Sequence, residues 1–166
     1  MKYYNIAGIG AGGKMGSAVL NFAHRISAHW KTILSSRSLN EGPSEVVMRS
    51  GDVDLTYTAA RSNLDAIKAL LGVRNAMVFL ALKPQQFNEA APEIREGMQL
   101  LGDNAFLVSI LAGTLMKTLS DQTGCRAVVR CMPNMPIGDG WGITYCVANA
   151  DVTEEQRALT TKLLNG

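Results

Sequence analysis

A cluster of glycines near the amino terminus has the composition of a phosphate-binding turn. An apolar run over residues 5–9 leads into Gly10, Gly12, Gly13 and Gly16, and apolar side chains at helical spacing follow over residues 15–26. A glycine turn between a strand and a helix lets the main chain approach a diphosphate, and the N–H groups of the first helical turn face its charge. We therefore predict a dinucleotide site, with a purely structural turn as the alternative.

The spacing of these glycines departs from the usual G-x-G-x-x-G pattern. Gly10, Gly12 and Gly16 give a motif that is one residue longer. A register from Gly8 through Gly10 to Gly13 fits the count, but it places the turn inside the expected strand. We prefer the first register, with Gly13 as the extra residue.

A second polar segment follows the strand expected over residues 31–35. It contains Ser35, Ser36, Arg37 and Ser38. In dinucleotide folds the end of the second strand meets the adenosine ribose, where a carboxylate binds the 2′-hydroxyl of NAD. This segment has no carboxylate, and the Arg37 guanidinium with the serine hydroxyls suits a 2′-phosphate. The segment predicts NADP over NAD, and the alternative is a solvated loop.

Three more expected strands end in residues that suit ligand contact. The strand over 76–82 runs into Lys83, which either meets a cofactor phosphate or is solvated. The strand over 105–110 ends at Leu111, Ala112 and Gly113, which allow close main-chain approach. The strand over 127–131 leads into a loop rich in proline and glycine, where Asn134 is either a turn former or a polar group that orients substrate or the nicotinamide amide.

The rest of the chain alternates between strand and helix patterns. The expected elements are helices over 43–50 (opened by Gly42-Pro43) and 63–71 (closed by Gly72), a helical stretch broken by Pro92, a helix N-capped by Thr114, strands over 53–58 and 143–148, and a helix opened by the capping box at 153–156. Strands that alternate with helices indicate a parallel sheet covered on both faces. We predict the α/β class with a Rossmann-type, doubly wound, mostly parallel sheet.

Composition limits the kinds of partner. The 166 residues, 47% of them hydrophobic, suit one domain. A net charge of +2 does not favour nucleic acid, the apolar runs are too short for a membrane span, and the first residues lack a signal-peptide core, so we expect a cytoplasmic protein. Cys125, Cys131 and Cys146 are expected to be buried thiols without a metal or disulfide, and His24 and His29 to be surface or helix-end residues rather than ligands.

Four segments together resemble the cofactor domain of the pyrroline-5-carboxylate reductases. They are residues 9–16 (IGAGGKMG), 79–85 (FLALKPQ), 109–113 (SILAG) and 130–136 (RCMPNMP), and they occur in the family's order. The resemblance covers essentially the whole chain. It implies a reductase that passes hydride from NADPH or NADH to the C=N bond of 1-pyrroline-5-carboxylate and forms L-proline, the last step of proline biosynthesis.

The resemblance also implies roles for individual residues. The diphosphate would be held by Ile9, Gly10, Ala11, Gly12, Gly13, Lys14, Met15 and Gly16. Ser36 and Arg37 would hold the ribose end of the adenosine, and Asn63 would contact the adenosine. The groove would be lined by Ala81, Lys83 and Pro84, and the nicotinamide end would be approached by Leu111, Ala112 and Gly113. Met132 and Asn134 would lie near the site of hydride transfer. No catalytic acid is assigned.

The chain departs from the family pattern in three places. The glycine loop has its extra residue, and Met135 stands where the family commonly has Thr. The family also continues into a helical domain that carries the dimer interface and grips the substrate. We therefore expect residues 1–166 to form the NAD(P)-binding domain without that second domain. The expected partner is a small-molecule substrate, and a homo-oligomer stays open because the usual interface lies in the other domain.

Overall fold

The computed structural model describes residues 4–26, 30–35, 45–50 and 53–165, and side chains are described for these residues except 26, 45–50, 53–56 and 165. The described strands form one eight-stranded sheet in the order β3-β4-β2-β1-β5-β6-β7-β8. The strands are β1 (Tyr4–Ile9), β2 (Trp30–Ser35), β3 (Glu45–Ser50), β4 (Val53–Ala60), β5 (Ala76–Leu80), β6 (Ala105–Ser109), β7 (Val128–Pro133) and β8 (Thr144–Ala148). Six neighbouring strands, from β4 to β7, are parallel, and β3 and β8 are antiparallel at the two edges.

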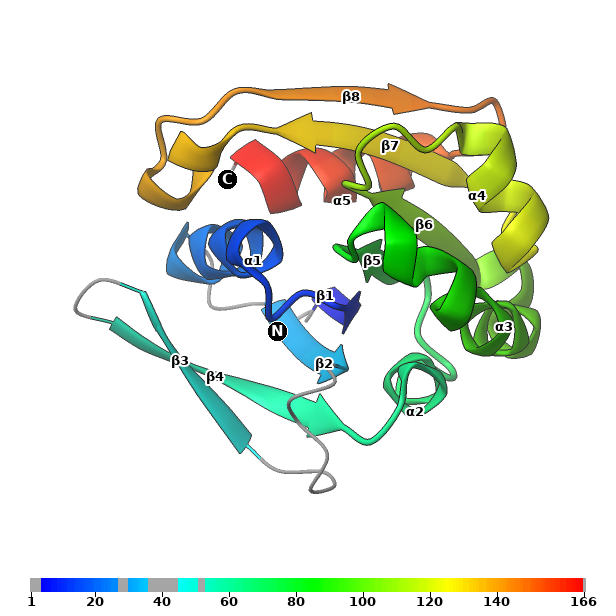
Figure 1. Cartoon of the computed structure of the whole chain (residues 1–166), viewed down its shortest axis with the longest axis horizontal. Helices are drawn as coiled ribbons and strands as arrows, with labels where there is room; N and C mark the ends of the chain where they lie inside the picture. Colours follow the sequence, from blue (N-terminus) through cyan, green and yellow to red (C-terminus); the bar gives the residue numbers. More distant parts are fainter. Residues whose placement is uncertain (1–3, 27–29, 36–44, 51–52, 166) are drawn as a thin grey trace.

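The helices cover both faces of this sheet (Figure 1). They are α1 (Lys14–Ile26), α2 (Asn63–Lys68), α3 (Pro84–Leu101), α4 (Met116–Thr123) and α5 (Glu154–Asn165), with short 3-10 helices η1 (Gly102–Asn104) and η2 (Met135–Asp139). One apolar cluster joins the sheet to α2, α3 and α4, and another joins it to α1 and α5. The predicted doubly wound, mostly parallel α/β fold is therefore confirmed.

The strand order places a topological switch beside β1. β1 pairs in parallel with β2 on one side and with β5 on the other. The chain therefore winds away from β1 in two directions, and the loops that follow these strands separate at their carboxyl ends. In open α/β sheets, ligands bind in this crevice.

The helix predicted over residues 43–50 is wrong. The structure has β3 there, paired antiparallel with β4 so that Ser50 lies opposite Val53. Gly51 and Asp52, which join the two strands in the sequence, lie outside the described residues. Pairing with β4 outweighs the weak helical preference that Pro43 suggests, because helix propensity is small relative to tertiary context.

Pro92 does not break the helical stretch, contrary to the prediction. The α3 helix runs without interruption, and Pro92 lies exposed inside it. The face that includes Phe87, Ile94 and Met98 is buried against the sheet. Burial of this face offsets the hydrogen bond that a proline removes from a helix.

Two helix ends also differ from the predictions, and one agrees. Thr114 does not cap a helix, because α4 is preceded by Leu115 and the Thr114 hydroxyl donates to Ala112 O at 3.4 Å. The α2 helix ends at Lys68, before the expected position, and Gly72 lies in the turn beyond it with φ of 78°. The capping box is confirmed: Thr153 N donates to Gln156 Oε1 at 3.0 Å, and Gln156 N donates to Thr153 Oγ1 at 3.2 Å.

The cysteine and histidine predictions hold in part. Cys125 and Cys131 are buried as expected, whereas Cys146 is exposed, because the edge strand β8 carries it. His24 lies in the last turn of α1, as the helix-end alternative expects, but it is half-buried there, 2.9 Å from Thr32 Oγ1 and edge-on to the Tyr57 ring. His29 lies outside the described residues.

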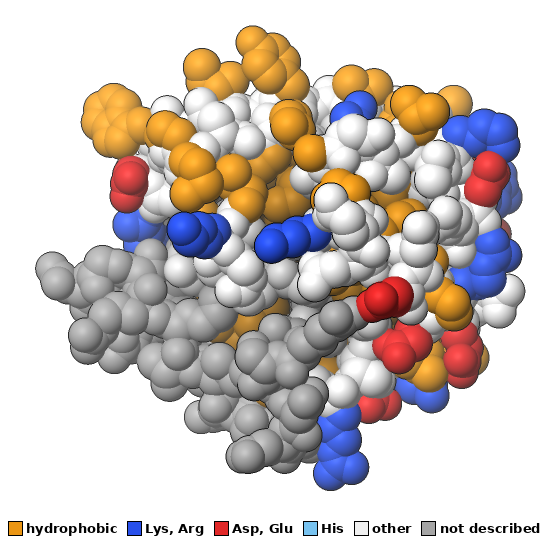
Figure 2. All heavy atoms as spheres, viewed as in Figure 1, with side chains coloured by type: hydrophobic (Ala, Val, Ile, Leu, Met, Phe, Trp, Pro, Cys, Tyr) orange, Lys and Arg blue, Asp and Glu red, His pale blue; other side chains and the backbone are white. Residues whose placement is uncertain are grey.

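Apolar side chains gather on the part of the surface that β8 and the loop before it form, at the top of Figure 2. The exposed members there are Trp141, Ile143, Tyr145 and Val147. Among the described residues, no helix is both long enough and apolar enough to cross a membrane.

Candidate nucleotide-binding site

The glycine turn follows β1 directly at the switch point. Gly10 has φ of 67°, and a Cβ placed on it would lie 2.5 Å from Leu82 Cδ2, so this position requires glycine on both counts. Gly10 N donates to Ser35 O at 3.1 Å, which joins the turn to the end of β2. The turn is thus fixed to the neighbouring strand and presents main chain at the carboxyl edge.

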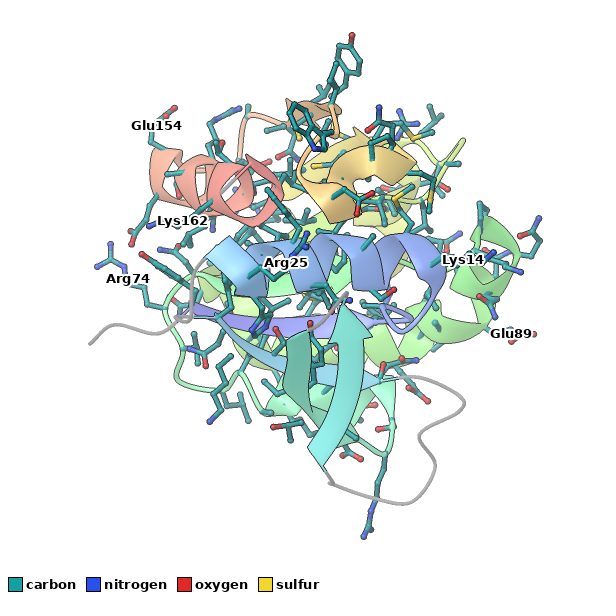
Figure 3. All side chains as sticks on the ribbon, turned by 90° about the vertical axis from the view of Figure 1, so that its left-hand side faces the viewer. Lys14, Arg25, Arg74, Glu89, Glu154 and Lys162 are labelled. Carbon is teal, nitrogen blue, oxygen red and sulfur yellow. The ribbon has the colours of Figure 1, made fainter. Side chains whose placement is uncertain are left out.

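The first helical turn of α1 faces this glycine turn. Ser17 N donates to Gly13 O at 2.9 Å, which is the hydrogen bond that starts the helix. Because a helix leaves its first N–H groups without intrahelical acceptors, those of residues 14–16 point back toward the turn. Lys14 is exposed at this end of α1, the end of the molecule where Glu89 of α3 also lies (Figure 3). The geometry can accept an anion.

The roles of individual glycines fit the longer register. Gly8 lies buried inside β1, so a turn cannot begin there. A Cβ on Gly16 would lie 2.7 Å from Ala81 Cβ and 2.7 Å from Ala11 Cα, so Gly16 lets α1 pack closely against the sheet. Gly10 therefore makes the turn and Gly16 the helix–sheet contact, as the preferred register has it. Gly12 and Gly13 are exposed between them.

The turn opens into a hollow of about 500 Å³. Its lining comes from the ends of β1, β2, β4 and β5 and from one face of α3. It includes Gly10, Gly12, Gly13, Ser35 and Asn63, which sequence analysis placed in the cofactor site, together with Arg61, Ser62, Leu82, Gln86, Glu89, Ala90 and Glu93. Ile9 and Ala11 are fully buried beside the turn, so only their main chain could contact a ligand.

The far end of the hollow is held together by side-chain hydrogen bonds. Ser35 is buried, and its hydroxyl donates to Asn63 Oδ1 at 2.6 Å. Asn63 N in turn donates to Glu93 Oε2 at 3.0 Å. These contacts bring the end of β2, the start of α2 and the middle of α3 to one place. Ser36 and Arg37 lie outside the described residues.

The remaining predicted groove residues follow the carboxyl ends of β5 and β6. Ala81 N donates to Ile9 O at 2.9 Å, and Ala81 contacts the Gly16 side of α1. Lys83 is exposed, and its N–H donates to Gln86 Oε1 at 3.2 Å, while Pro84 opens α3. After β6, Leu111 is buried, whereas Ala112 and Gly113 are exposed, and Gly113 has φ of 69°. Because β5 and β6 are paired in parallel, both segments lie at the same edge.

The segment after β7 continues this edge. Met132 and Asn134 are both exposed. Asn134 Oδ1 accepts a hydrogen bond from Ile143 N at 2.9 Å, and Asn134 N donates to Ile143 O at 3.3 Å. The carbonyl of its side chain therefore acts within the loop, as the turn-former interpretation expects. Met135 is exposed at the start of η2.

Sequence reasoning missed the contribution of α3 and of the residue that follows β4. Gln86, Glu89 and Glu93 line the hollow from one face of α3, and their spacing of three and four residues is the signal that could have found them. Arg61 comes directly after β4, which is two residues longer than the expected strand. Arg61 brings a positive charge to the hollow, and the two glutamates bring negative charges.

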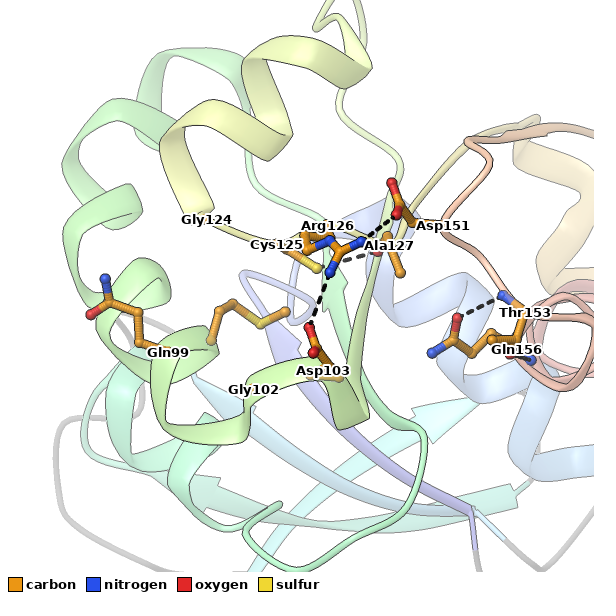
Figure 4. Close-up of a pocket in the computed structure, with 12 residues that line it drawn as sticks. Gln99, Gly102, Asp103, Gly124, Cys125, Arg126, Ala127, Asp151, Thr153 and Gln156 are labelled. Carbon is orange, nitrogen blue, oxygen red and sulfur yellow. Dashed lines mark hydrogen bonds and ion pairs between the residues drawn. The ribbon is translucent and has the colours of Figure 1, made fainter.

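A second hollow, of about 390 Å³, lies at the amino ends of the parallel strands, where β6 and β7 begin (Figure 4). Arg126 there bridges two carboxylates, with contacts of 3.9 Å to Asp103 and 3.0 Å to Asp151. These side chains are exposed and already paired, and none of the residues predicted to bind cofactor lines this hollow. Among the described residues, no group of three His, Cys, Asp or Glu side chains could hold a metal ion.

Comparison with known proteins agrees with the fold and the predicted resemblance. No protein-family model matches the chain. A pyrroline-5-carboxylate reductase of Pisum sativum is 28% identical over 160 residues, which are 96% of this chain and 54% of that protein. The chain thus spans about half the length of the curated relatives it matches.

Solved structures of proteins with the same name share the fold. The Plasmodium falciparum pyrroline carboxylate reductase, solved with NADP bound, superposes with a TM-score of 0.76 at 18% identity, over 99% of this chain and 55% of that one. A Coxiella burnetii pyrroline-5-carboxylate reductase gives a TM-score of 0.76 at 21% identity, over 99% and 56% of the two chains. The chain is thus similar in sequence to curated pyrroline-5-carboxylate reductases over 96% of its length, and it shares the fold of the solved ones.

Proposed function

We propose that this chain is the NADP-binding part of a reductase that reduces the C=N bond of 1-pyrroline-5-carboxylate to L-proline in proline biosynthesis. The observation that carries the proposal is the convergence of the segments after β1, β5, β6 and β7 on one carboxyl edge, in a chain that matches pyrroline-5-carboxylate reductases over 96% of its length. The relatives are about twice as long, so the activity is proposed for the full-length protein.

The residues at the edge fit a dinucleotide. The hollow of about 500 Å³ begins at the glycines, where an added Cβ at Gly10 would collide with Leu82. A diphosphate would lie over the glycine turn and be held by the main-chain N–H groups of residues 14–16, and the adenosine end would lie near Ser35 and Asn63. The nicotinamide end would lie toward Leu111, Ala112 and Gly113, with the substrate beside Met132 and Asn134.

The preference for NADP(H) over NAD(H) rests on Arg37 and its neighbouring serines. The described lining supplies Arg61 but also Glu89 and Glu93, so this part of the hollow does not by itself favour an additional phosphate. A guanidinium at position 37 would supply the planar donor pair that a 2′-phosphate needs.

The bound nicotinamide would supply the hydride, and the protein would supply position and electrostatics. In this chain the groove residues Ala81, Lys83 and Pro84 would fix the cofactor along the edge. We assign no side chain as the catalytic acid, and an imine that is protonated before it binds would need none.

The test is NADPH oxidation in the presence of 1-pyrroline-5-carboxylate by the full-length gene product, followed by the absorbance of NADPH and by detection of proline. We expect turnover that the Gly12→Val variant abolishes, because the valine side chain blocks main-chain approach to the diphosphate. Binding of NADPH without turnover would favour an alternative, a stand-alone NADP-binding or regulatory module. Turnover only with other imines or with a deazaflavin would favour a related reductase.

The proposal also covers partners and location. The partner is a small-molecule substrate, with no nucleic acid or membrane partner, and a homo-oligomer is tested by light scattering of the full-length protein. The cytoplasmic location expected from the sequence is tested by imaging a fluorescent fusion of the same gene product.

A further inference from the structure

Two cysteines face each other across the antiparallel pair β7 and β8. Cys131 and Cys146 are directly opposite in the register, and their sulfur atoms lie 3.0 Å apart. The two strands run side by side along one side of the molecule (Figure 1). The fold thus holds two thiols in contact that are fifteen residues apart in sequence.

The hydrogen-bond pattern places this pair at the site where a cross-strand link fits. Asn134 N donates to Ile143 O, and Asn149 N donates to Val128 O, so both of these opposite pairs are hydrogen-bonded. Every second pair between them is hydrogen-bonded as well, because the two kinds of pair alternate along an antiparallel ladder. Cys131 and Cys146 fall on a pair that is not hydrogen-bonded. The Cα atoms of such pairs are about 4.5 Å apart, which is within the range of about 4.4–6.8 Å that a disulfide spans.

The two thiols differ in access. Cys131 is 1% exposed, whereas Cys146 is exposed on the edge strand. Cys146 also lines a hollow of about 290 Å³ between β8 and α5, together with Arg157. A small oxidant can therefore reach Cys146 first, and Cys131 lies behind it as the only neighbouring thiol among the described residues.

We propose that Cys146 and Cys131 form a peroxide-sensitive site, in which a small hydroperoxide oxidises Cys146 and Cys131 resolves the product to a reversible intramolecular disulfide. In the first step the Cys146 thiolate attacks the peroxide, an S–O bond forms, the O–O bond breaks, and hydroxide or alkoxide leaves. In the second step Cys131 attacks the Cys146 sulfenic acid, an S–S bond forms, and the S–O oxygen leaves as water with the Cys131 proton. Both sulfur atoms are oxidised by one electron each, and the peroxide is reduced by two electrons.

The surroundings agree with these roles. The hydrogen bond with Cys131 holds the pKa of Cys146 below its usual value, which favours the thiolate that attacks the peroxide. The same hydrogen bond, followed by burial, raises the pKa of Cys131, so Cys131 keeps its proton until the second step. Cys125 is different, because burial raises its pKa to about 12 and its sulfur contacts Ala127 O.

The experiment treats the reduced chain with hydrogen peroxide, counts free thiols and maps disulfide-linked peptides without reduction. We expect the three thiols to fall to one, with residues 131 and 146 in a linked peptide, and dithiothreitol to restore all three. The Cys125→Ser variant is the matched control and keeps the reaction. The Cys146→Ser variant loses it, and the Cys131→Ala variant, checked for folding by its melting temperature, accumulates a sulfenic acid at Cys146 that dimedone traps.

Several results would overturn the proposal. They are a linked peptide that joins two chains, sulfinic or sulfonic acid at Cys146 in the wild-type chain without a link to Cys131, or no oxidation by peroxide that oxidises free cysteine. We expect the reaction at Cys146 to be at least about tenfold faster than at Cys125, because thiolate character and exposure set the rate. This site is independent of the proposed reductase activity, so either can fail alone.

Discussion

Ser35 Oγ donates a hydrogen bond to Asn63 Oδ1 at 2.6 Å, although the two residues are 28 positions apart in the chain. Ser35 ends β2 and Asn63 begins α2, so this contact closes the far end of the hollow that starts at the glycine turn. Sequence analysis placed both residues near the adenosine by separate arguments. The contact gives Ser35 a positioning role, since its buried hydroxyl is already engaged with Asn63.

Replacement of Ser35 by Ala tests that positioning role. The loss of the hydrogen bond should lower the free energy of unfolding by about 1 kcal/mol. It should also weaken the binding of NADPH and of NADH equally, by about fivefold, which corresponds to the same free energy. Binding is measured by calorimetric titration and stability by denaturant unfolding. Ser120→Ala is the matched control, because Ser120 Oγ donates to Cys125 O at 2.7 Å on α4, away from the hollow. Loss of NADPH binding alone would mean that Ser35 contacts the 2′-phosphate directly.

An added methyl group should lower stability at Gly16 and should weaken nucleotide binding without a large stability change at Gly13. Gly16→Ala should cost about 1–3 kcal/mol of unfolding free energy, because its Cβ would lie 2.7 Å from both Ala81 Cβ and Ala11 Cα. Gly13→Ala should change stability by less than about 0.5 kcal/mol, because its nearest neighbour would be Gly10 O at 3.6 Å. Gly13→Ala should nevertheless weaken binding of both nucleotides, since the methyl group enters the hollow. Equal stability losses for the two variants would contradict the assigned register.

Arg37→Asp tests the cofactor preference. The substitution removes a charged donor and adds repulsion, so NADPH binding should weaken by about 10- to 100-fold, while NADH binding changes much less. Calorimetric titration of both nucleotides gives the ratio. Arg126→Ala, at the amino ends of the strands, is the control and should leave both affinities unchanged. Equal losses of NADPH and NADH affinity in Arg37→Asp would discard the ribose assignment.

His24 should make the fold less stable in mild acid. Burial lowers its pKa from 6.5 to about 4. Between these values the unfolded chain binds the proton and the folded chain does not, so the stability is full above pH 6.5 and falls as the pH drops toward 4. With allowance for partial exposure, we expect about 1–2 kcal/mol over this window. In the His24→Gln variant the unfolding free energy should depend less on pH across this window, as measured by denaturant unfolding at its two ends. An unchanged pH dependence would mean that other groups cause it.

The parallel core of the sheet could be predicted from the sequence, because its strands are apolar runs that are buried on both faces. The run at 76–80 shows this directly, since all five residues are buried. The glycine turn could also be predicted, because only glycine tolerates the positive φ and the close Leu82 contact at position 10.

The parts that could not be predicted depend on contacts between distant segments. β3 exists because it pairs with β4, which local helix signals do not reveal. Pro92 is tolerated because one face of α3 is buried against the sheet. Glu89 and Glu93 reach the hollow only because α3 packs beside α2, and Cys146 is exposed only because β8 is an edge strand.

A crystal structure of the chain with NADP⁺ tests the central claim most directly. The account predicts a nucleotide with its diphosphate over Gly10, Gly12 and Gly13, its adenosine beside Asn63, and its nicotinamide toward Gly113 and Asn134. A nucleotide bound in the hollow around Arg126, at the amino ends of the strands, would contradict it. So would a crystal grown with saturating NADP⁺ that holds no nucleotide at the glycine turn.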